Sequence, residues 1–458
     1  MGRLIAVSNR TAADPKARAG GLAVALWDAL SASDGVWLGW SGEVVEGGPP
    51  RGVTMFRDEG VDFILADLTQ EEHEGFYNSY ANRLLWPVFH YRNDLARFDE
   101  NDYRIYAAVN DRFARILAAR AREDDIVWIH DYHFLLLGEA LRREGWEGRI
   151  GFFLHIPFPS PEMFRIIPQH HHIARALCSC DVVGFQSTND KANFERYLVE
   201  HCGAEERADG CFDVYGRRVK IDAYPIGIDA EAFRACVDTE AAQTAIRRIS
   251  RFIGERQHVI GVDRMDYSKG LPERFAAVGR LFEEYPETRG KLSVTQIAPP
   301  SRSTVYEYQE LRNELAEYSG RVNGDYGDLD WAPLRYLVRS FEREELAGLF
   351  SISRVGLVTP LRDGMNLVAK EYVAAQNEED PGVLILSEFA GAAEQLEAAL
   401  LVNPYDTAAL AEAINMALHM PLHERLERWR QLYESVTSYD IVWWREKFLA
   451  DLRESPVC

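Results

Sequence analysis

The feature that most limits the fold of this chain is a regular alternation of short apolar runs with longer amphipathic stretches. The short runs are rich in Val, Ile and Phe, and the longer stretches have the apolar spacing of helices. Short and continuously apolar strands are typical of a parallel sheet that helices cover on both faces. The sequence therefore predicts an α/β protein.

The alternation runs through the first half of the chain and restarts in the second half. In the first half the predicted strands cover residues 4–8, 36–40, 61–66, 126–130, 150–155, 182–186 and 219–224. In the second half they cover 259–263, 292–298, 355–359 and 383–387, with helices expected to begin near Gly270, Arg302, Asn366 and Thr407. The segment 388–400, rich in Ala and Glu, is interpreted as one more helix face.

A Pro/Gly turn separates the two halves. It reads Tyr-Pro-Ile-Gly-Ile-Asp at 224–229 and places a domain boundary near residue 230. The prediction is two Rossmann-like, doubly wound domains, residues 1–230 and 231–458. Open α/β sheets bind ligands beyond the carboxyl ends of their strands, so we expect the function in a central cleft that the two domains face.

The charge of the chain restricts its ligands. With 72 acidic and 51 basic residues, the formal net charge is -21. Such a charge opposes nucleic-acid backbones and anionic membranes, so neither is an expected partner. An anionic small molecule must therefore be met by a local basic pocket.

Cysteine usage and hydropathy indicate the compartment. The six cysteines in 458 residues are too few for a disulfide framework, and no C-x-x-C pair is present. The apolar run at the amino terminus is too short for a signal peptide, and no stretch approaches the roughly 18 apolar residues of a membrane span. We expect a cytoplasmic protein.

The usual nucleotide-binding fingerprints are missing. No G-x-G-x-x-G follows a strand and no G-x-x-x-x-G-K-[ST] occurs, which disfavours dinucleotide oxidoreductases and P-loop enzymes. Instead Ser8-Asn9-Arg10 follows the first strand, and Gly20-Gly21 opens a helical run. Free backbone N–H groups at a helix start suit an anion, although a plain turn explains paired glycines equally well.

A basic loop leaves the first strand of the second half. In Gly-Val-Asp-Arg-Met-Asp-Tyr-Ser-Lys-Gly-Leu at 261–271, Arg264 and Lys269 stand where a parallel sheet presents its ligands. Two cations placed there can neutralise a diphosphate and oppose the charge that grows when it leaves. The alternative is a solvated surface pair of no function.

A second loop repeats the pattern after the strand at 355–359. Its N–H groups from Gly364 through Asn366 to Leu367 suit a phosphate, whereas Asp363 would repel one and suits a sugar hydroxyl. Glu371, two turns into the helix, can accept hydrogen bonds from both hydroxyl groups of a ribose. Its alternative is the commoner fate of a helical glutamate, which is exposure to solvent.

Asp131 and His155 each follow a strongly apolar strand, so both are expected to face the cleft. Several other polar clusters are read as structural. His130 with His133, the run 170–172, and the D-x-D pair Asp328 and Asp330 do not form a convincing coordination set. No metal site is therefore predicted.

The motifs together resemble the trehalose-6-phosphate synthase family, whose members are retaining glucosyltransferases of GT-B architecture. The similarity runs through nearly the whole chain. The segments that carry it are Ser-Asn-Arg at 8, Gly-Gly-Leu at 20, Trp-Leu-Gly-Trp-Ser-Gly at 37, Leu-Trp-Pro-Val-Phe-His-Tyr at 85, His-Asp-Tyr-His at 130, Leu-His-Ile-Pro-Phe-Pro-Ser at 154, Tyr-Pro-Ile-Gly-Ile-Asp at 224, Asp-Arg-Met-Asp-Tyr-Ser-Lys-Gly at 263 and Leu-Arg-Asp-Gly-Met-Asn-Leu-Val-Ala-Lys-Glu-Tyr at 361.

The resemblance implies a role for each of these positions. Residues 1–230 would bind the acceptor and 231–458 the nucleotide sugar, with a last helix at about 438–454 crossing back to the first domain. The implied donor site is Gly21, Trp40, Arg264, Lys269, Asp363, Asn366, Leu367 and Glu371. The implied acceptor site is Arg10, Tyr77, Trp86, Asp131, His155 and Arg302. Arg264, Lys269, Asp363, His155 and Asp131 would be closest to the reaction.

The activity that the resemblance implies is transfer of glucose from UDP-glucose to glucose 6-phosphate, with no cofactor and no metal. A sister activity that accepts glycerol 3-phosphate, as in glucosylglycerol-phosphate synthase, is the alternative. A catalytically silent sugar-nucleotide sensor is a third hypothesis, disfavoured by the intact charged residues. We also expect a homo-oligomer, either a dimer or a tetramer.

Overall fold

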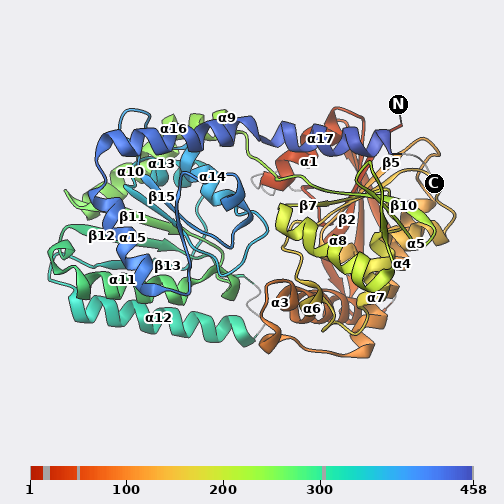
Figure 1. Ribbon diagram of the computed structural model, residues 1–458, viewed down its shortest axis with the longest axis horizontal. Helices are drawn as coiled ribbons and strands as arrows, with labels where there is room; N and C mark the ends of the chain where they lie inside the picture. Colours follow the sequence, from red (N-terminus) through yellow and green to blue (C-terminus); the bar gives the residue numbers. More distant parts are fainter. Residues whose placement is uncertain (1, 14–20, 49–51, 302–305, 456–458) are drawn as a thin grey trace. The chain divides into compact units, whose positions relative to one another are not determined.

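The computed structural model describes residues 2–13, 21–48, 52–301 and 306–455. The chain divides into two compact units (Figure 1): unit 1 comprises residues 1–225 with 442–458, and unit 2 comprises residues 226–441. Each unit contains one sheet with helices packed on it, so the predicted α/β class is confirmed. Within the described ranges, no helix is both long enough and apolar enough to cross a membrane.

Unit 1 is built on a sheet of ten strands among the described residues, in the order β3-β4-β2-β1-β5-β6-β7-β10-β9-β8. The strands from β4 to β10 in this order run parallel, and the edge strands β3, β9 and β8 pair antiparallel. Their bounds are β1 (Leu4–Arg10), β2 (Val36–Val45), β3 (Val53–Asp58), β4 (Val61–Thr69), β5 (Ile126–His130), β6 (Ile150–Phe153), β7 (Val182–Phe185), β8 (Glu205–Glu206), β9 (Cys211–Val214) and β10 (Arg217–Ala223).

The helices of unit 1 include a long π-helical segment and the last helix of the chain. The α-helices are α1 (Gly21–Ser31), α2 (Gln70–Glu72), α3 (Trp86–Phe89), α4 (Glu100–Ala118), α5 (Leu137–Arg143), α6 (Pro161–Phe164), α7 (His170–Leu177), α8 (Thr188–Cys202) and α17 (Ile441–Glu454). The π-helix η2 (His73–Leu85) runs directly into α3, and the short 3-10 turns are η3 (Asn93–Leu95) and η4 (Tyr132–Phe134).

Helix α17 belongs to the core of unit 1 although unit 2 precedes it in the chain. Phe448 stacks on Trp128 of β5 with ring centroids 4.8 Å apart, and Trp444 lies 5.0 Å from the same ring. Gly151 of β6 allows this approach, because a Cβ there would lie 2.7 Å from Phe448. Trp128, Trp444 and Phe448 are fully buried, so α17 completes the apolar core.

In the described part of unit 2, six parallel strands form a sheet in the order β13-β12-β11-β14-β15-β16. Their bounds are β11 (Gln257–Val262), β12 (Leu292–Ile297), β13 (Leu334–Leu337), β14 (Val355–Val358), β15 (Val383–Ser387) and β16 (Leu400–Val402). The helices are α9 (Ala230–Ala235), α10 (Glu240–Ile253), α11 (Leu271–Glu284), α12 (Tyr306–Tyr326), α13 (Arg343–Ser351), α14 (Leu367–Ala374), α15 (Thr407–His419) and α16 (Leu422–Ser438), with 3-10 turns η5 (Cys236–Asp238), η6 (Tyr267–Lys269), η7 (Pro286–Thr288) and η8 (Gly391–Glu394).

The strand order of unit 2 places its functional loops. Helices α11, α12 and α15 pack together on one face of the sheet, whereas α10, α13, α14 and α16 cover the other (Figure 1). The strand order reverses between β11 and β14, which are direct neighbours. The carboxyl ends of adjacent parallel strands lie at one edge, and a reversal there is the usual ligand position in such sheets. The loops after β11 and β14 therefore meet.

The structure corrects parts of the sequence interpretation. Strands β3, β8, β9, β13 and β16 were not predicted. The segment 388–400 is not a helix face: it forms the short 3-10 turn η8 and leads into β16. Tertiary hydrogen bonds explain the difference. The N–H groups of Gly391 and Ala392 donate to carbonyl groups of the loop after β14 rather than to carbonyl groups of a helix of their own.

Candidate functional site

The loop after β11 is held tightly in unit 2. Arg264 is exposed there, whereas Lys269 is 8 % exposed at the end of η6. Gly270 follows with φ +64°, and a Cβ on it would lie 2.3 Å from the carbonyl oxygen of Thr359. Glycine is required for both reasons: the left-handed backbone and the close approach of the loop after β14. This glycine starts α11 and fixes Lys269 beside the second loop.

Lys269 forms an ion pair with Asp363 of the loop after β14. The distance from Nζ to Oδ2 is 2.5 Å, and the two side chains are 10 % and 15 % exposed. Asn366 Nδ2 donates to the same Oδ2 at 3.0 Å. A cation, a carboxylate and an amide predicted separately from the sequence are therefore one cluster.

The helix start beside this cluster has an unusual backbone. Asn366 caps α14 with φ +74° and ψ 85°, and its side chain makes no capping hydrogen bond to the helix. Its amide bonds instead to Asp363. The first N–H groups of α14, beginning at Leu367, have no partner within a helix turn and point beyond its amino end, which favours an anion.

A second segment, residues 391–396, holds the loop after β14 in place through backbone hydrogen bonds. The N–H of Gly391 donates to the carbonyl of Asp363 at 3.1 Å, and that of Ala392 donates to the carbonyl of Met365 at 2.9 Å. A Cβ at Gly391 would lie 1.8 Å from the carbonyl oxygen of Gly364, so no side chain fits there. The position of Asp363 is therefore set by backbone contacts.

Glu371 lies in α14 and is only partly exposed. Burial raises the pKa of its carboxyl to about 7, against an opposing effect of the Arg343 cation. The structure therefore does not support the alternative interpretation of Glu371 as a fully solvent-exposed glutamate. A carboxylate in this setting can accept hydrogen bonds from a diol such as a ribose.

A buried arginine that the sequence interpretation missed supports both loops. Arg274 of α11 is 1 % exposed and pairs with Asp263 at 2.7 Å. It also donates to Gln296 Oε1 at 2.7 Å and to Thr359 Oγ1 at 3.0 Å. These three acceptors follow or end β11, β12 and β14. A glutamine inside the apolar strand at 292–298 was the one sequence signal of this network.

In unit 1, Asp131 and His155 lie together at the carboxyl ends of β5 and β6. Asp131 has φ +74°, and its Oδ1 accepts from the backbone N–H of His155 at 3.2 Å. Its own N–H donates to the carbonyl of Phe153 at 2.8 Å. Such a backbone is uncommon for a residue other than glycine, and strained residues of this kind cluster at active sites.

The His155 ring is neutral and its orientation is fixed. Burial lowers its pKa to about 3. Gln186, which the sequence interpretation did not single out, places Nε2 3.3 Å from His155 Nδ1. With that amide donating, the ring hydrogen of His155 lies on Nε2 and donates to Nδ1 of His130 at 3.2 Å. His130 therefore orients the ring of His155.

Arg10, Trp40 and Tyr77 form an aromatic and cationic cluster in unit 1. The Arg10 guanidinium lies 4.8 Å over the Trp40 ring, and that ring lies 5.5 Å from Tyr77. Gly42, at φ +95°, leaves room for Arg10, because a Cβ there would lie 2.6 Å from the guanidinium. Arg10 is exposed at the end of β1, so its charge is available to an anion.

Tyr77 and Trp86 are placed by the π-helix η2 and by α3, which follows it. Trp86 is 4 % exposed, and its ring lies 4.0 Å from His90 and 5.7 Å from Tyr132, the residue after Asp131. π-helical turns are rare and are common at functional sites. No sequence pattern indicated this one.

Two predicted site residues cannot be described in full. Arg302 lies outside the described residues. Gly21 is the first residue of α1, of which the backbone is described. The remaining predicted residues fall into two groups: Arg10, Trp40, Tyr77, Trp86, Asp131 and His155 in unit 1, and Arg264, Lys269, Asp363, Asn366, Leu367 and Glu371 in unit 2.

The aspartates of the D-x-D motif do not converge. Asp330 pairs with Arg256 at 3.3 Å and has an 84 % exposed side chain, while Asp328 forms an isolated bridge to Trp331. Among residues 2–13, 21–48, 52–301 and 306–455, no group of three or more His, Cys, Asp or Glu side chains is arranged to hold a metal ion.

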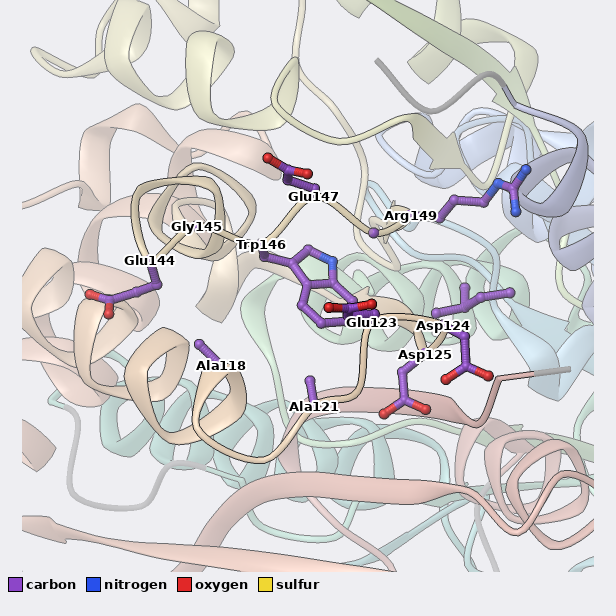
Figure 2. Close-up of a pocket in the computed structure, with 12 residues that line it drawn as sticks. Ala118, Ala121, Glu123, Asp124, Asp125, Glu144, Gly145, Trp146, Glu147 and Arg149 are labelled. Carbon is purple, nitrogen blue, oxygen red and sulfur yellow. The ribbon is translucent and has the colours of Figure 1, made fainter.

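A pocket elsewhere in unit 1 has the wrong charge for a phosphorylated ligand. It lies at the amino ends of β5 and β6 and has a volume of about 660 Å³ (Figure 2). Its lining includes Glu123, Asp124, Asp125, Glu144 and Glu147 against a single Arg149. Five carboxylates repel an anion. The cationic groups at the carboxyl ends of the strands are therefore the better candidate site.

The chain is similar to known proteins over nearly its whole length. The sequence profile of glycosyltransferase family 20 matches residues 4–454. A trehalose-6-phosphate synthase of Cronobacter sakazakii is 46% identical over 457 residues, which are 99% of this chain and 96% of the relative.

Two solved structures have similar folds and hold ligands. One is an α,α-trehalose-phosphate synthase (UDP-forming) from Burkholderia xenovorans in complex with glucose-6-phosphate, with 44% identity, a TM-score of 0.95 and coverage of 99% of this chain and 100% of that one. The other, from E. coli, is described as trehalose-6-phosphate bound with UDP-2-fluoro glucose, with 43% identity, a TM-score of 0.95 and coverage of 99% of both chains.

Proposed function

The chain belongs to glycosyltransferase family 20, and from this premise we propose that it transfers glucose from UDP-glucose to glucose 6-phosphate, giving α,α-trehalose 6-phosphate and UDP. The observation that carries the proposal is the cluster of Lys269, Asp363 and Asn366 at the start of α14. It combines a cation for a diphosphate with a carboxylate for a sugar hydroxyl. Nothing in the structure favours glycerol 3-phosphate as acceptor.

The donor is proposed to bind unit 2. Arg264 and Lys269 oppose the diphosphate, and the N–H groups at Asn366 and Leu367 add partial positive charge. Asp363 accepts from a hydroxyl of the transferred glucose, and Glu371 accepts from the ribose. From unit 1, Gly21 and Trp40 are proposed to contact the diphosphate.

The acceptor is proposed to bind unit 1. Arg10 and Arg302 hold its phosphate, because an acidic protein binds an anionic sugar only through local cations. Tyr77 and Trp86 flank that phosphate. Asp131 and His155 contact the hydroxyl groups of the sugar.

The chemistry requires no nucleophile from the protein. The bond between the anomeric carbon and the diphosphate oxygen breaks while the acceptor C1 hydroxyl oxygen bonds to the same face of that carbon. The proton of this hydroxyl passes to the departing diphosphate oxygen. The protein supplies position and charge: Arg264 and Lys269 stabilise the leaving group, and the neutral His155 adds no competing cation.

The setting of the reaction completes the proposal. We infer a cytoplasmic enzyme that needs no cofactor or divalent metal, since protein cations and backbone N–H groups take the role of a metal on the diphosphate. We also infer that it works as a homo-oligomer, which light scattering of the purified protein tests directly.

The deciding experiment offers the purified protein UDP-, ADP- and GDP-glucose, each with glucose 6-phosphate or glycerol 3-phosphate. NMR of the product identifies both the bond and the anomeric configuration. We expect α,α-trehalose 6-phosphate from UDP-glucose and glucose 6-phosphate. Product only with glycerol 3-phosphate, or no turnover with any pair, would reject the proposed function.

A further inference from the structure

Lys370 is a buried lysine for which the chemistry above has no use. It follows Ala369 in α14, and the whole residue is 1 % exposed. Its Nζ donates to the carbonyl oxygen of Ile226 at 2.8 Å and to Oε1 of Gln395 at 2.7 Å. Both acceptors are neutral. Burial without a described ion pair lowers the pKa of its ammonium group to about 7.

A lysine without a carboxylate partner is a costly way to fill a core position. An apolar side chain of similar size would fill the same space without desolvating an amine. What Lys370 adds is a pair of directed hydrogen bonds between segments far apart in the sequence: Ile226 is 144 residues from it, and Gln395 is 25 residues from it. These two hydrogen bonds are therefore what Lys370 contributes to the structure.

Each of the two segments supports the donor site or its surroundings. Gln395 lies in the 391–396 segment, whose N–H groups bond to the carbonyls of Asp363 and Met365. Its own carbonyl accepts from Ser435 Oγ of α16 at 2.7 Å. Ile226 is the first residue of unit 2, where the chain enters from unit 1. Lys370 therefore joins α14, the 391–396 segment and the chain segment around Ile226 within one unit.

We propose that Lys370 is a positioning residue for the donor: by bonding Ile226 and Gln395 it fixes α14, and with it Glu371 and the loop carrying Asp363, in the arrangement that binds a nucleoside diphosphate. This inference rests on the proposed donor role of unit 2. Lys370 does not touch the donor. It fixes the position of α14 one residue before Glu371. Through Gln395 it also fixes the segment that holds Asp363.

The test is UDP affinity by calorimetry, together with the kinetics for both substrates. Lys370→Met keeps the volume and removes the donors. We expect about a 10-fold weaker UDP affinity and a similar rise in the KM for UDP-glucose, with kcat and the KM for glucose 6-phosphate changed less than 3-fold. Lys291→Met is the matched control, because Lys291 is exposed in the same unit. It should leave all four values unchanged.

A double mutant separates positioning from general loss of stability. Gln395→Leu alone should weaken UDP binding about 3-fold, and combined with Lys370→Met it should add almost nothing, because both changes remove the same contact. Multiplied effects of about 30-fold would overturn the proposed route through Gln395. A folded Lys370→Met with normal UDP affinity and a lowered Tm would overturn the positioning role.

A second variant and a wild-type control separate the possible outcomes. If Lys370→Met does not fold, Lys370→Gln is measured against the same expectations, because its amide nitrogen ends one bond short of the lysine Nζ and cannot make both hydrogen bonds from the same place. The wild-type protein is assayed for trehalose 6-phosphate in parallel. UDP binding that depends on Lys370 in a wild type that makes no such product would reject the acceptor assignment alone, whereas wild type without UDP affinity would reject the donor role of unit 2.

Discussion

Replacing Lys269 with alanine tests the proposed chemistry most directly. The Lys269 side chain is 10 % exposed and its Nζ lies 2.5 Å from Asp363, so this cation is already fixed in the absence of donor. A preorganised charge of this kind opposes the negative charge that develops on the departing diphosphate. Losing one such group costs about 3 kcal/mol in the transition state, or about 100-fold in kcat.

The effect on folding should be smaller than the effect on turnover. Asp363 loses its cation but keeps the hydrogen bond from Asn366 Nδ2 at 3.0 Å. The side chain is 15 % exposed, so water can reach part of the carboxylate. We therefore expect the unfolding free energy to fall by about 1–2 kcal/mol, the lower part of the usual cost of leaving a polar group without its partner.

The assay follows UDP release at saturating glucose 6-phosphate, with differential scanning calorimetry on the same sample. A folded Lys269→Ala protein with kcat within 3-fold of wild type would refute the reasoning. So would a variant that regains activity when Asp363 is also neutralised, because the lysine would then serve only to balance that carboxylate.

Three further predictions concern the acceptor, the metal and the pH profile. Arg10→Ala or Arg302→Ala should raise the KM for glucose 6-phosphate about 10- to 100-fold, the worth of a charge-assisted hydrogen bond, and leave UDP affinity by calorimetry unchanged; loss of UDP binding would mean that the two sites are exchanged. Activity should survive exhaustive EDTA, and Asp328→Asn with Asp330→Asn should retain most of it, whereas rescue of a lost activity by Mg²⁺ would contradict the cation-pair mechanism. Because the pKa of Glu371 is raised to about 7, its carboxylate becomes protonated as pH falls below 7 and accepts more weakly from the ribose, so UDP should bind about 5-fold less tightly at pH 6 than at pH 8; Glu371→Gln should abolish this part of the dependence.

The fold was predictable where strands are buried on both faces. Residues 4–7 of β1, residues 259–262 of β11 and all of β14 are apolar or glycine, and all of them are buried. The edge strand β3 exposes four of its six residues and β8 has two residues, so neither has an apolar pattern to detect. Edge strands depend on pairing with a neighbour, which no local pattern records.

The sequence marked single residues of the candidate site but not the network of contacts between them. Lys269 and Asp363 each follow an apolar strand, and that position marks both as ligand-facing. Their contact spans 94 residues and depends on β11 and β14 being neighbours, which spacing alone does not determine. Arg274 and Gln186 were missed because a buried polar side chain is recognised by its partners, and those partners come from other strands.

The place of α17 has a consequence for the order in which the protein forms during synthesis. Trp444 and Phe448 complete the core of unit 1 around Trp128, but the ribosome makes them after all of residues 226–441. At about 5–20 residues per second, unit 1 waits roughly 10–40 s with that apolar surface uncovered. The last residues to be synthesised therefore complete the unit that was begun first, and a nascent chain stalled before residue 441 leaves Trp128 without its aromatic partners Trp444 and Phe448.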